Sequence, residues 1–397
     1  MKKIHFALCS ILLLASCGGG SSEDTGKNYI ADFKKAYDAS YSSGAYSFTS
    51  KNGMKLGAGI KNLNGTYYHL SGSGLTFQAD AKGVKGSEAS SLKGQLLLTG
   101  GSLSLTTNAS TLSKFSDFTT LSPVKAKAYF DGDALYFNAS GENKSSETNS
   151  TVGALVQTVI REASGNTSYV LYGGGDIFQT ANRYKGKWTL GDEDKQKISD
   201  KMPLVKEGDT LSEHFSLSSF LEGAYEDGSG KTAFAFETKD DGTKRIKFET
   251  KDETVLTAAM SAGFATFRTT LDTSESVPTQ EEVDNEIEKF FRYADIKTFS
   301  VTTLFKDSGL NQVTYDMNFI LDETKIKETY PDAMFDFSEN APEGSEPNDY
   351  KFNLDESLSF SGTILCDFGD EDSFALPSDL SGYLEFPAIS SKEGSGE

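Results

Sequence analysis

Side chains suited to nucleophilic catalysis are scarce in this chain of 397 residues, which holds three histidines and three cysteines. A serine or cysteine nucleophile needs a neighbouring histidine that is oriented by a carboxylate. His69 lies in the strand-like run YYHLSG and His214 lies in a helical pattern, so neither has the local sequence of a nucleophile site. Cys366 alternates with apolar residues, which predicts a buried side chain rather than a reactive thiol. The pattern favours a protein without catalytic activity.

Metal and phosphate sites also lack their usual patterns. No cysteine and histidine have the spacing of zinc ligands. The acidic triplets that begin at Asp192 and Asp370 lack the alternating oxygens and the turn glycine of a calcium loop. There is no glycine-rich phosphate loop, and nothing singles out a pair of carboxylates for glycoside hydrolysis. We therefore expect no metal and no cofactor.

Cys17 is the cysteine with the clearest chemical context. Residues 1–16 place two lysines before a short apolar run, which is the composition of a signal peptide and too short for a membrane-spanning helix. The motif LASC at residues 14–17 resembles the bacterial lipobox, whose cysteine carries a diacylglyceryl group. Several acyl chains anchor a protein stably. We expect a lipoprotein on the extracytoplasmic side of the cell membrane or outer membrane, with residues 17–27 as a flexible tether.

The charge is distributed unevenly along the chain. Residues 17–222 hold 21 basic and 21 acidic side chains, whereas residues 223–397 hold 15 basic and 37 acidic ones, a net charge of −22. So acidic a protein is repelled by a phosphate backbone, which argues against nucleic acid as a partner. The acidic half is a solvated surface, points away from an anionic membrane, or meets a cationic protein partner.

The elements that would position functional side chains include several helices with one apolar face. Residues 253–267 fit a helix or a strand equally well. The helix over 280–294 is preceded by a capping box that joins Thr279 and Glu282. Apolar residues recur at helical spacing over residues 26–42, 150–163, 192–202, 209–222 and 280–294.

The remaining pattern is β-rich. Short runs broken by Gly, Ser and Asn fill residues 45–140, and a long apolar alternation over 352–368 suggests a large curved sheet. The acidic, proline-containing segment 331–349 is predicted to be a loop. Hairpin turns are predicted at residues 131–132, 241–242 and 306–309.

This order of elements behind a lipobox resembles the LolA/LppX class of lipoprotein and lipid carriers. The resemblance is carried by residues 128–136 and 186–188, the hairpin around Gly309 and residues 376–379. It implies an α+β fold, in which a large curved antiparallel sheet forms an incomplete β-barrel with helices packed on its concave side. We expect residues 28–390 to form this fold as a single domain, or as two lobes of residues 28–222 and 223–390.

We therefore expect a non-catalytic lipoprotein that binds a lipid or another hydrophobic ligand in a half-barrel. The alternative is an acidic envelope scaffold or adhesin that binds a protein partner. The apolar faces of the helices and the sheet fit either a solid core or an acyl-chain pocket, and the pattern does not distinguish the two. It also does not identify the ligand, the oligomeric state, or which of the two membranes holds the anchor. The residues expected to line such a pocket are Leu155, Val159, Phe215, Phe220, Phe234, Phe236, Val301, Phe319, Phe360 and Ile364.

Overall fold

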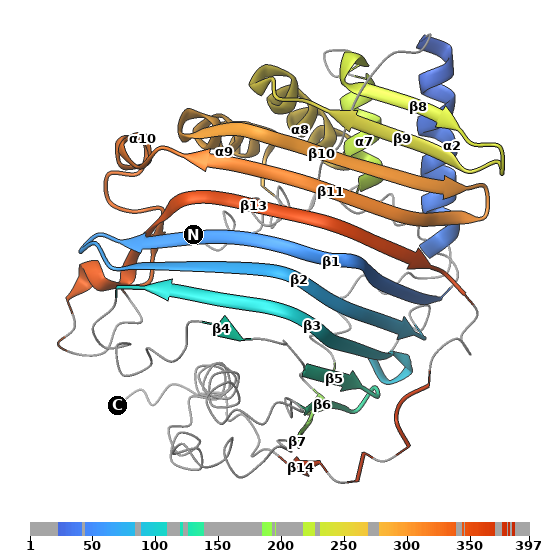
Figure 1. Ribbon diagram of the computed structural model, residues 1–397, viewed down its shortest axis with the longest axis horizontal. Helices are drawn as coiled ribbons and strands as arrows, with labels where there is room; N and C mark the ends of the chain where they lie inside the picture. Colours follow the sequence, from blue (N-terminus) through green and yellow to red (C-terminus); the bar gives the residue numbers. More distant parts are fainter. Residues whose placement is uncertain are drawn as a thin grey trace.

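The computed structural model spans residues 1–397 and describes residues 23–41, 44–83, 89–108, 120–121, 126–138, 185–192, 195, 217–226, 231–268, 278–338, 344, 346–369, 375–378, 380–381 and 383–385. The described strands form one sheet of 14 strands (Figure 1). In chain order they are β1 (Ala45–Asn62), β2 (Tyr67–Lys82), β3 (Lys93–Thr107), β4 (Thr120–Leu121), β5 (Ala126–Phe130), β6 (Ala134–Asn138), β7 (Lys185–Thr189), β8 (Phe234–Thr238), β9 (Lys244–Glu249), β10 (Ala294–Lys306), β11 (Gly309–Leu321), β12 (Phe335–Asp336), β13 (Lys351–Asp367) and β14 (Leu384–Glu385).

The sheet is antiparallel apart from its β14–β7 edge, where the two strands are parallel. Across the sheet the order is β14-β7-β6-β5-β3-β2-β1-β13-β11-β10-β9-β8, with β4 beside β3 and β12 beside β13. The sheet is not closed, because its two end strands, β8 and β14, do not pair with each other. The expectation of a large antiparallel sheet is confirmed. Strands of both expected lobes share it, since β13 pairs with β1 on one side and with β11 on the other.

The helices over 23–41, 217–226 and 280–293 overlap predicted helical segments, whereas the helix over 323–329 has no counterpart among the predictions. The first begins at Glu23, so residues 23–27 are helical rather than part of a tether. Residues 1–16, Cys17, the predicted helix 150–163 and residues 209–216 lie outside the described residues, as does most of 192–202. The helices are α2 (Glu23–Tyr41), α7 (Leu217–Glu226), α8 (Glu253–Arg268), α9 (Gln280–Tyr293) and α10 (Glu323–Thr329), and short 3-10 helices are η1 (Ala89–Ser91), η4 (Lys231–Ala233) and η6 (Pro347–Tyr350).

Local capping explains two of these helices. The Thr279 hydroxyl accepts the Glu282 N–H, and a Glu282 carboxylate oxygen accepts the Thr279 N–H at 2.7 Å, so the predicted capping box is confirmed. Residues 253–267, which fit two patterns, form α8. Asp252 caps it by accepting the Thr254 N–H at 2.8 Å. The buried side of α8 has helical spacing and consists of Leu256, Ala259, Met260, Gly263, Phe264 and Phe267.

Strands β8–β11 and the helices α2, α7, α8 and α9 enclose the main hydrophobic core, and we call this part the covered half. In Figure 1 these helices gather beside β8–β11, in the upper part of the view. Aromatic rings pack within the sheet and between sheet and helices: the centroids of Phe234 and Phe248 on β8 and β9 lie 4.6 Å apart, and those of Phe290 on α9 and Phe319 on β11 lie 5.2 Å apart. All four side chains are at most 2% exposed, which is the packing of a filled protein interior.

The strand register brings a row of apolar side chains to one face of the sheet from β10 to β3, and we call this face the apolar face; Tyr129 and Tyr136 of β5 and β6 are buried on the other face. One row of directly paired residues across six strands illustrates it, running Phe299, Met317, Phe360, Leu56, Gly72 and Leu103. A neighbouring row on the opposite face is polar and runs Thr302, Thr314, Thr363 and Lys51.

Strands β1, β2 and β3 are long, with 18, 16 and 15 residues. The expected run is too short for β1, whereas the expected runs over 65–79 and 92–107 contain most of β2 and β3. Three glycines of this region, Gly53, Gly74 and Gly101, lie inside strands at register shifts and have φ of 74°, 61° and 92°. A Cβ on Gly53 would lie 2.6 Å from Gly74 Cα, and one on Gly101 would lie 2.5 Å from the Gly74 carbonyl oxygen. These three residues form a glycine line across the sheet, and bulges of this kind bend strands.

The predicted hairpins at 131–132, 241–242 and 306–309 are confirmed as β5–β6, β8–β9 and β10–β11. Segment 331–349, predicted to be a loop, is more structured than expected where it is described. Its residues Phe335–Asp336 pair with β13 as β12, and η6 begins at Pro347. These pieces bring Asp349 next to the β1–β2 turn.

Candidate functional site

The part of the apolar face on β1, β2, β3, β5 and β6 is only partly covered, and we call it the open half. The described helices pack mainly against β8–β11 and β13. No apolar side chain of β2 or β3 whose exposure the structure describes is buried. Leu70 on β2, Leu96 on β3 and Leu135 on β6 are 40%, 44% and 38% exposed. Large exposed apolar patches mark binding surfaces in soluble proteins.

The residues predicted to line an apolar pocket divide between the core and its border. Phe220, Phe234, Val301 and Phe319 are at most 2% exposed and belong to the main hydrophobic cluster of the covered half. The half-buried side chains among them are Phe236, Phe360 and Ile364, which pack against that cluster. The remaining three, Leu155, Val159 and Phe215, lie outside the described residues.

Phe360 and Ile364 on β13 lie at the border between the two halves. Phe360 pairs with Met317 of the covered half on one side and with Leu56 of the open half on the other. Ile364 similarly lies between Val313 and Ser50. Of the predicted pocket residues, these two therefore lead from the filled core to the open half.

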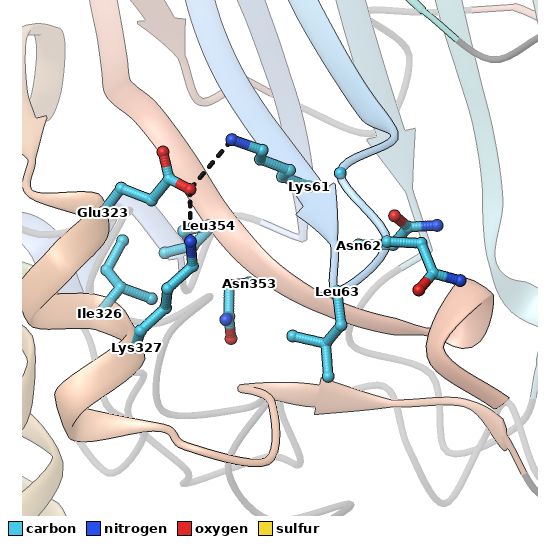
Figure 2. A pocket seen from close by; sticks show the side chains of 10 residues that line it. Lys61, Asn62, Leu63, Glu323, Ile326, Lys327, Asn353 and Leu354 are labelled. Carbon is cyan, nitrogen blue, oxygen red and sulfur yellow. Dashed lines mark hydrogen bonds and ion pairs between the residues drawn. The ribbon is translucent and has the colours of Figure 1, made fainter.

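A pocket of about 310 Å³ lies at one end of the sheet, where the β1–β2 turn approaches α10 (Figure 2). Lys61 and Asn353 pair with each other and lie two residues from Gly59 and Asp355, so their side chains are on the face opposite to the apolar face, whereas Leu354 is on the apolar face. The lining combines apolar side chains with amides, two ammonium groups and one carboxylate. Its residues are Lys61, Asn62, Leu63, Asn64, Gly65, Glu323, Ile326, Lys327, Asn353 and Leu354.

The charged side chains of the pocket form one network around Glu323, as Figure 2 shows. One carboxylate oxygen of Glu323 accepts hydrogen bonds from the ammonium groups of Lys327 at 2.8 Å and Lys61 at 3.0 Å. The bonds from Lys327 and Lys61 lower the pKa of the Glu323 carboxyl. The bond to Glu323 raises the pKa of Lys61. The Glu323 carboxylate and the Lys61 ammonium group therefore stay charged at neutral pH, and Asp355 and Glu356 also act on Lys61.

Asn353 contributes hydrogen-bond donors that the protein itself does not use. The residue is 6% exposed, and its carbonyl Oδ1 accepts the Met334 N–H at 2.7 Å, which defines the orientation of the amide. The Nδ2 group carries two further donors and has no hydrogen-bond partner among the described residues. In Figure 2 the side chain lies between Lys327 and Leu63 within the pocket. A donor held in this way is available to a ligand.

The turn that forms one wall is held by a second amide network. Asn62 is 6% exposed, and its Oδ1 accepts the Thr66 N–H at 2.8 Å. The Asn64 amide donates to the Asp349 carboxylate at 2.9 Å, and the Leu63 N–H donates to the Lys351 carbonyl at 3.0 Å. The wall is thus tied to η6 and β13 before any ligand is present.

His69 also lies on the face opposite to the apolar face, where its Nε2 lies 2.8 Å from a carboxylate oxygen of Asp355. Gly59 lies between His69 and Asp355 and pairs with both. A Cβ added to Gly59 would lie 2.6 Å from the His69 ring, so the contact needs glycine at this position. The neighbouring Glu356 has a φ of 60° at a bulge. No hydroxyl or thiol is hydrogen-bonded to His69 among the described residues. The arrangement is that of a structural histidine, as the sequence favoured.

Cys366 is 8% exposed, and burial raises the pKa of its thiol to about 12. The predicted burial of this side chain is confirmed. His214 lies outside the described residues. Within the described part of the chain, no three His, Cys, Asp or Glu side chains are arranged to hold a metal ion.

Sequence reasoning did not single out the pocket at the β1–β2 turn. Its residues come from three segments far apart in the chain, around Asn62, Glu323 and Asn353. The turn itself has a signal in the run NLNG, and Asp322 has the position of a helix cap before α10. Neither signal shows that the segments meet, because that depends on the pairing of β13 with β1.

Among the described helices, none combines the length and the apolar composition needed to cross a membrane. Comparisons of the chain with protein-family models, with curated proteins and with solved structures find no match.

Proposed function

We propose that this protein is a bacterial lipoprotein that holds a lipid or another hydrophobic ligand non-covalently on the open half of its apolar face. Residues 1–16 would be removed as a signal peptide, and the diacylglyceryl group on Cys17 would anchor the protein to the cell membrane or outer membrane, on the extracytoplasmic side. The protein binds and does not catalyse.

The observation that carries this proposal is the contrast in burial along the apolar face. Paired residues of the same row pass from 2% exposure at Phe319, through 8% at Leu358, to 40% at Leu70. Apolar side chains exposed next to a filled core are stabilised when an apolar partner removes them from water. An acyl chain fits this requirement, because each methylene it buries contributes about 0.8 kcal/mol.

The glycine line supports a concave shape for this surface. Bulges at Gly53, Gly74 and Gly101 occur side by side in three neighbouring strands, and aligned bulges bend a sheet in one direction. In the proposed fold the sheet is an incomplete barrel whose concave side is the apolar face. Helices fill one half of that side and the ligand occupies the other.

The binding proposal is tested with the full chain carrying Cys17→Ser, which cannot be acylated. The protein is purified, extracted with organic solvent and analysed by mass spectrometry, and we expect a co-purifying lipid. Leu96→Asp should abolish retention of that lipid because it places a charge on the open half. Ile320→Asp is the matched control, since Ile320 has nearly the same exposure, 45% against 44%, but lies on the opposite face.

Three results decide the matter. Loss of lipid in Leu96→Asp alone supports the proposal. Equal lipid in both variants places the ligand elsewhere. A lipid-free parent protein that also takes up no added lipid would overturn lipid binding and leave the acidic scaffold or adhesin function.

Anchoring is tested separately in a bacterial host. The unmodified chain should incorporate labelled palmitate and partition into the detergent phase of a Triton X-114 extract. Cys17→Ser should do neither, because the thioether cannot form. Membrane association that survives this substitution would argue against the proposed anchor.

A further inference from the structure

Helix α2 crosses the ends of the strands of the covered half, as Figure 1 shows. Near its start, the Tyr29 hydroxyl lies 2.6 Å from the Thr238 hydroxyl of β8. Near its end, the Ser40 hydroxyl accepts the Leu310 N–H of β11 at 2.7 Å. Along the chain, α2 therefore passes from β8, at the edge of the sheet, towards the centre of the sheet.

The start of α2 lies beyond β8 and against α7. Gly26 packs so closely against the ring of Tyr225 that a Cβ at this position would overlap the ring. From Glu23 to Tyr41 the helix measures about 27 Å, at about 1.5 Å per residue. The chain continues from Tyr41 into β1, so roughly the length of the helix separates the start of α2 from the first strand of the open half.

The tether between the proposed anchor and α2 is short. Only six residues of chain lead from Cys17 to Glu23, because α2 begins earlier than the sequence pattern predicted. Six residues span at most about 20–22 Å, whatever conformation they take. The open half is farther away, since β2 lies six strands from β8 and six strand spacings measure about 29 Å along the sheet. The anchor therefore reaches the edge of the covered half but not the open half.

Strand β8 forms one edge of the sheet, and no described strand pairs with its outer side. An edge strand exposes N–H and C=O groups with which another chain can pair, and a membrane surface next to it would prevent such pairing. Both signs of charge occur here, with Lys27 and Lys231 as well as Glu226 and Glu237. Charge alone therefore does not draw this edge to an anionic surface, and the anchor has to supply the attraction.

We propose that the short tether holds this edge, formed by β8 and the start of α2, against the membrane that carries the Cys17 anchor, and that the open half points away from that membrane. This inference rests on the anchoring part of the proposed function and adds an orientation to it. A hydrophobic ligand then enters the open half from the side away from the anchoring membrane. Because β8 belongs to residues 223–397, the acidic half as a whole does not point away from the membrane.

Fluorescence quenching by nitroxide-labelled head groups measures which residues lie at the bilayer surface. The acylated protein is reconstituted on the outside of phosphatidylcholine vesicles that contain the nitroxide lipid. One added cysteine then carries the fluorophore. In the acylated protein Cys17 is blocked by its thioether and Cys9 has left with the signal peptide, while the Cys366 thiol is buried with a pKa raised to about 12.

Four single-cysteine variants compare the edge with the open half. Asn28→Cys on α2 and Glu237→Cys on β8 place the fluorophore at the edge, where both residues are exposed. Leu70→Cys and Ser71→Cys are the matched pair on β2, because these two exposed neighbours point to opposite faces of the sheet. We expect a strong loss of fluorescence at both edge positions and no loss at either position of the pair.

Two controls separate the effect of the tether from that of the surface itself. With Cys9→Ser and Cys17→Ser added, the labelled chain has no anchor and should show no quenching at any of the four positions. A spacer of about 20 Gly and Ser residues after Ser22 raises the root-mean-square reach of the tether to about 25–30 Å, so quenching at Asn28 should fall. Unchanged quenching with the spacer, or quenching without the anchor, would overturn the tether as the cause.

The possible results separate this inference from the function on which it rests. An unmodified chain that is not acylated and does not float with the vesicles overturns the anchor and the orientation together. A vesicle-bound chain that is quenched at Leu70 or Ser71 as strongly as at Asn28 retains the anchor and overturns the orientation. A vesicle-bound chain that is quenched at none of the four positions also overturns the orientation alone.

Discussion

The covered and open halves share one sheet face and one alternating pattern, but they differ in what lies over them. Phe299 of β10 and Met317 of β11 are 1% and 2% exposed, whereas Leu70 of β2 and Leu96 of β3 are 40% and 44% exposed. The alternation decides which face a side chain takes. Burial depends instead on a second layer, which α2, α7, α8 and α9 supply over β8–β11. The same kind of surface therefore forms a core in one half and stays partly exposed in the other, where we propose that it binds the ligand.

The largest expected difference between the halves is the cost of removing an apolar side chain. Phe248 is completely buried and its ring contacts those of Phe234 and Phe220. Phe248→Ala should lower the free energy of unfolding by about 3–5 kcal/mol. Leu96→Ala should lower it by about 1 kcal/mol or less, because much of this side chain is already in water. Urea denaturation of the ligand-free protein measures both.

Equal losses in these two variants would contradict the division of the face. They would show that Leu96 is packed as tightly in solution as Phe248. If Leu96→Ala lowers the free energy of unfolding only in the presence of lipid, the comparison becomes sharper, because the bound lipid would then be the layer that covers Leu96.

The reactivity of the Cys366 thiol tests whether β13, the strand at the border between the two halves, is as inaccessible to water as the covered half. Burial raises its thiol pKa to about 12, so at pH 8 the reactive thiolate is about a thousandfold rarer than for a thiol with the ordinary value near 9. In a chain with Cys9→Ser and Cys17→Ser, Ellman's reagent should therefore label the native protein about a thousandfold more slowly than the unfolded one. Rapid native labelling would show that water reaches this part of β13.

The glycine line is the structural feature that distinguishes the strands of the open half. Gly101→Ala should destabilise the protein by about 3 kcal/mol, since its φ of 92° is unfavourable for alanine and a Cβ would lie 2.5 Å from the Gly74 carbonyl oxygen. Gly242→Ala in the β8–β9 turn has a φ of 79° with open space around it, so only about 1 kcal/mol is expected. Thermal unfolding compares the two.

A similar loss in both glycine variants would mean that the sheet relaxes around Gly101 without cost. The bend across β1, β2 and β3 would then not depend on close contact between the glycines. Lipid retention by Gly101→Ala adds a second readout, because a flattened sheet should hold an acyl chain less well.

Local chemistry made several elements predictable from the sequence. The capping box at Thr279 and the turns at Asp131 and Asp241 depend on residues within a few positions of each other, and the structure contains them as predicted. The apolar periodicity of Val283, Ile287 and Phe290 also identified the buried side of α9.

Long-range pairing limited the remaining predictions. The sequence pattern does not show that Gly53, Gly74 and Gly101 form aligned bulges, because that depends on the pairing of β1, β2 and β3. The pocket was missed for the same reason, since Lys61 and Asn353 become neighbours only through the β1–β13 register. The predicted pocket residues were chosen for being apolar, a property that core residues such as Phe319 share with ligand-binding ones.

The smallest expected effect on stability concerns the two aspartate-glycine hairpins, of which one lies in each half. In the covered half, the Asp241 carboxylate accepts the backbone N–H and the hydroxyl of Thr243, and these bonds with a contact to Lys306 lower its pKa to about 2. In the open half, burial raises the pKa of Asp131, but bonds from the Tyr136 hydroxyl and from backbone N–H groups outweigh it and lower the pKa overall.

A lowered pKa in the folded protein stabilises it above the unfolded pKa of about 3.9 and loses this effect as the pH falls through the folded value. Asp241→Asn should therefore reduce the urea midpoint slightly at pH 7, and the difference from the parent should shrink between pH 4 and about 2. Asp131→Asn should show the same direction of change, because the Tyr136 hydroxyl donates to the charged carboxylate at 2.7 Å. If either difference stays constant with pH, the charge of that aspartate does not stabilise its hairpin, and the turn depends on backbone geometry at Gly132 or Gly242 alone.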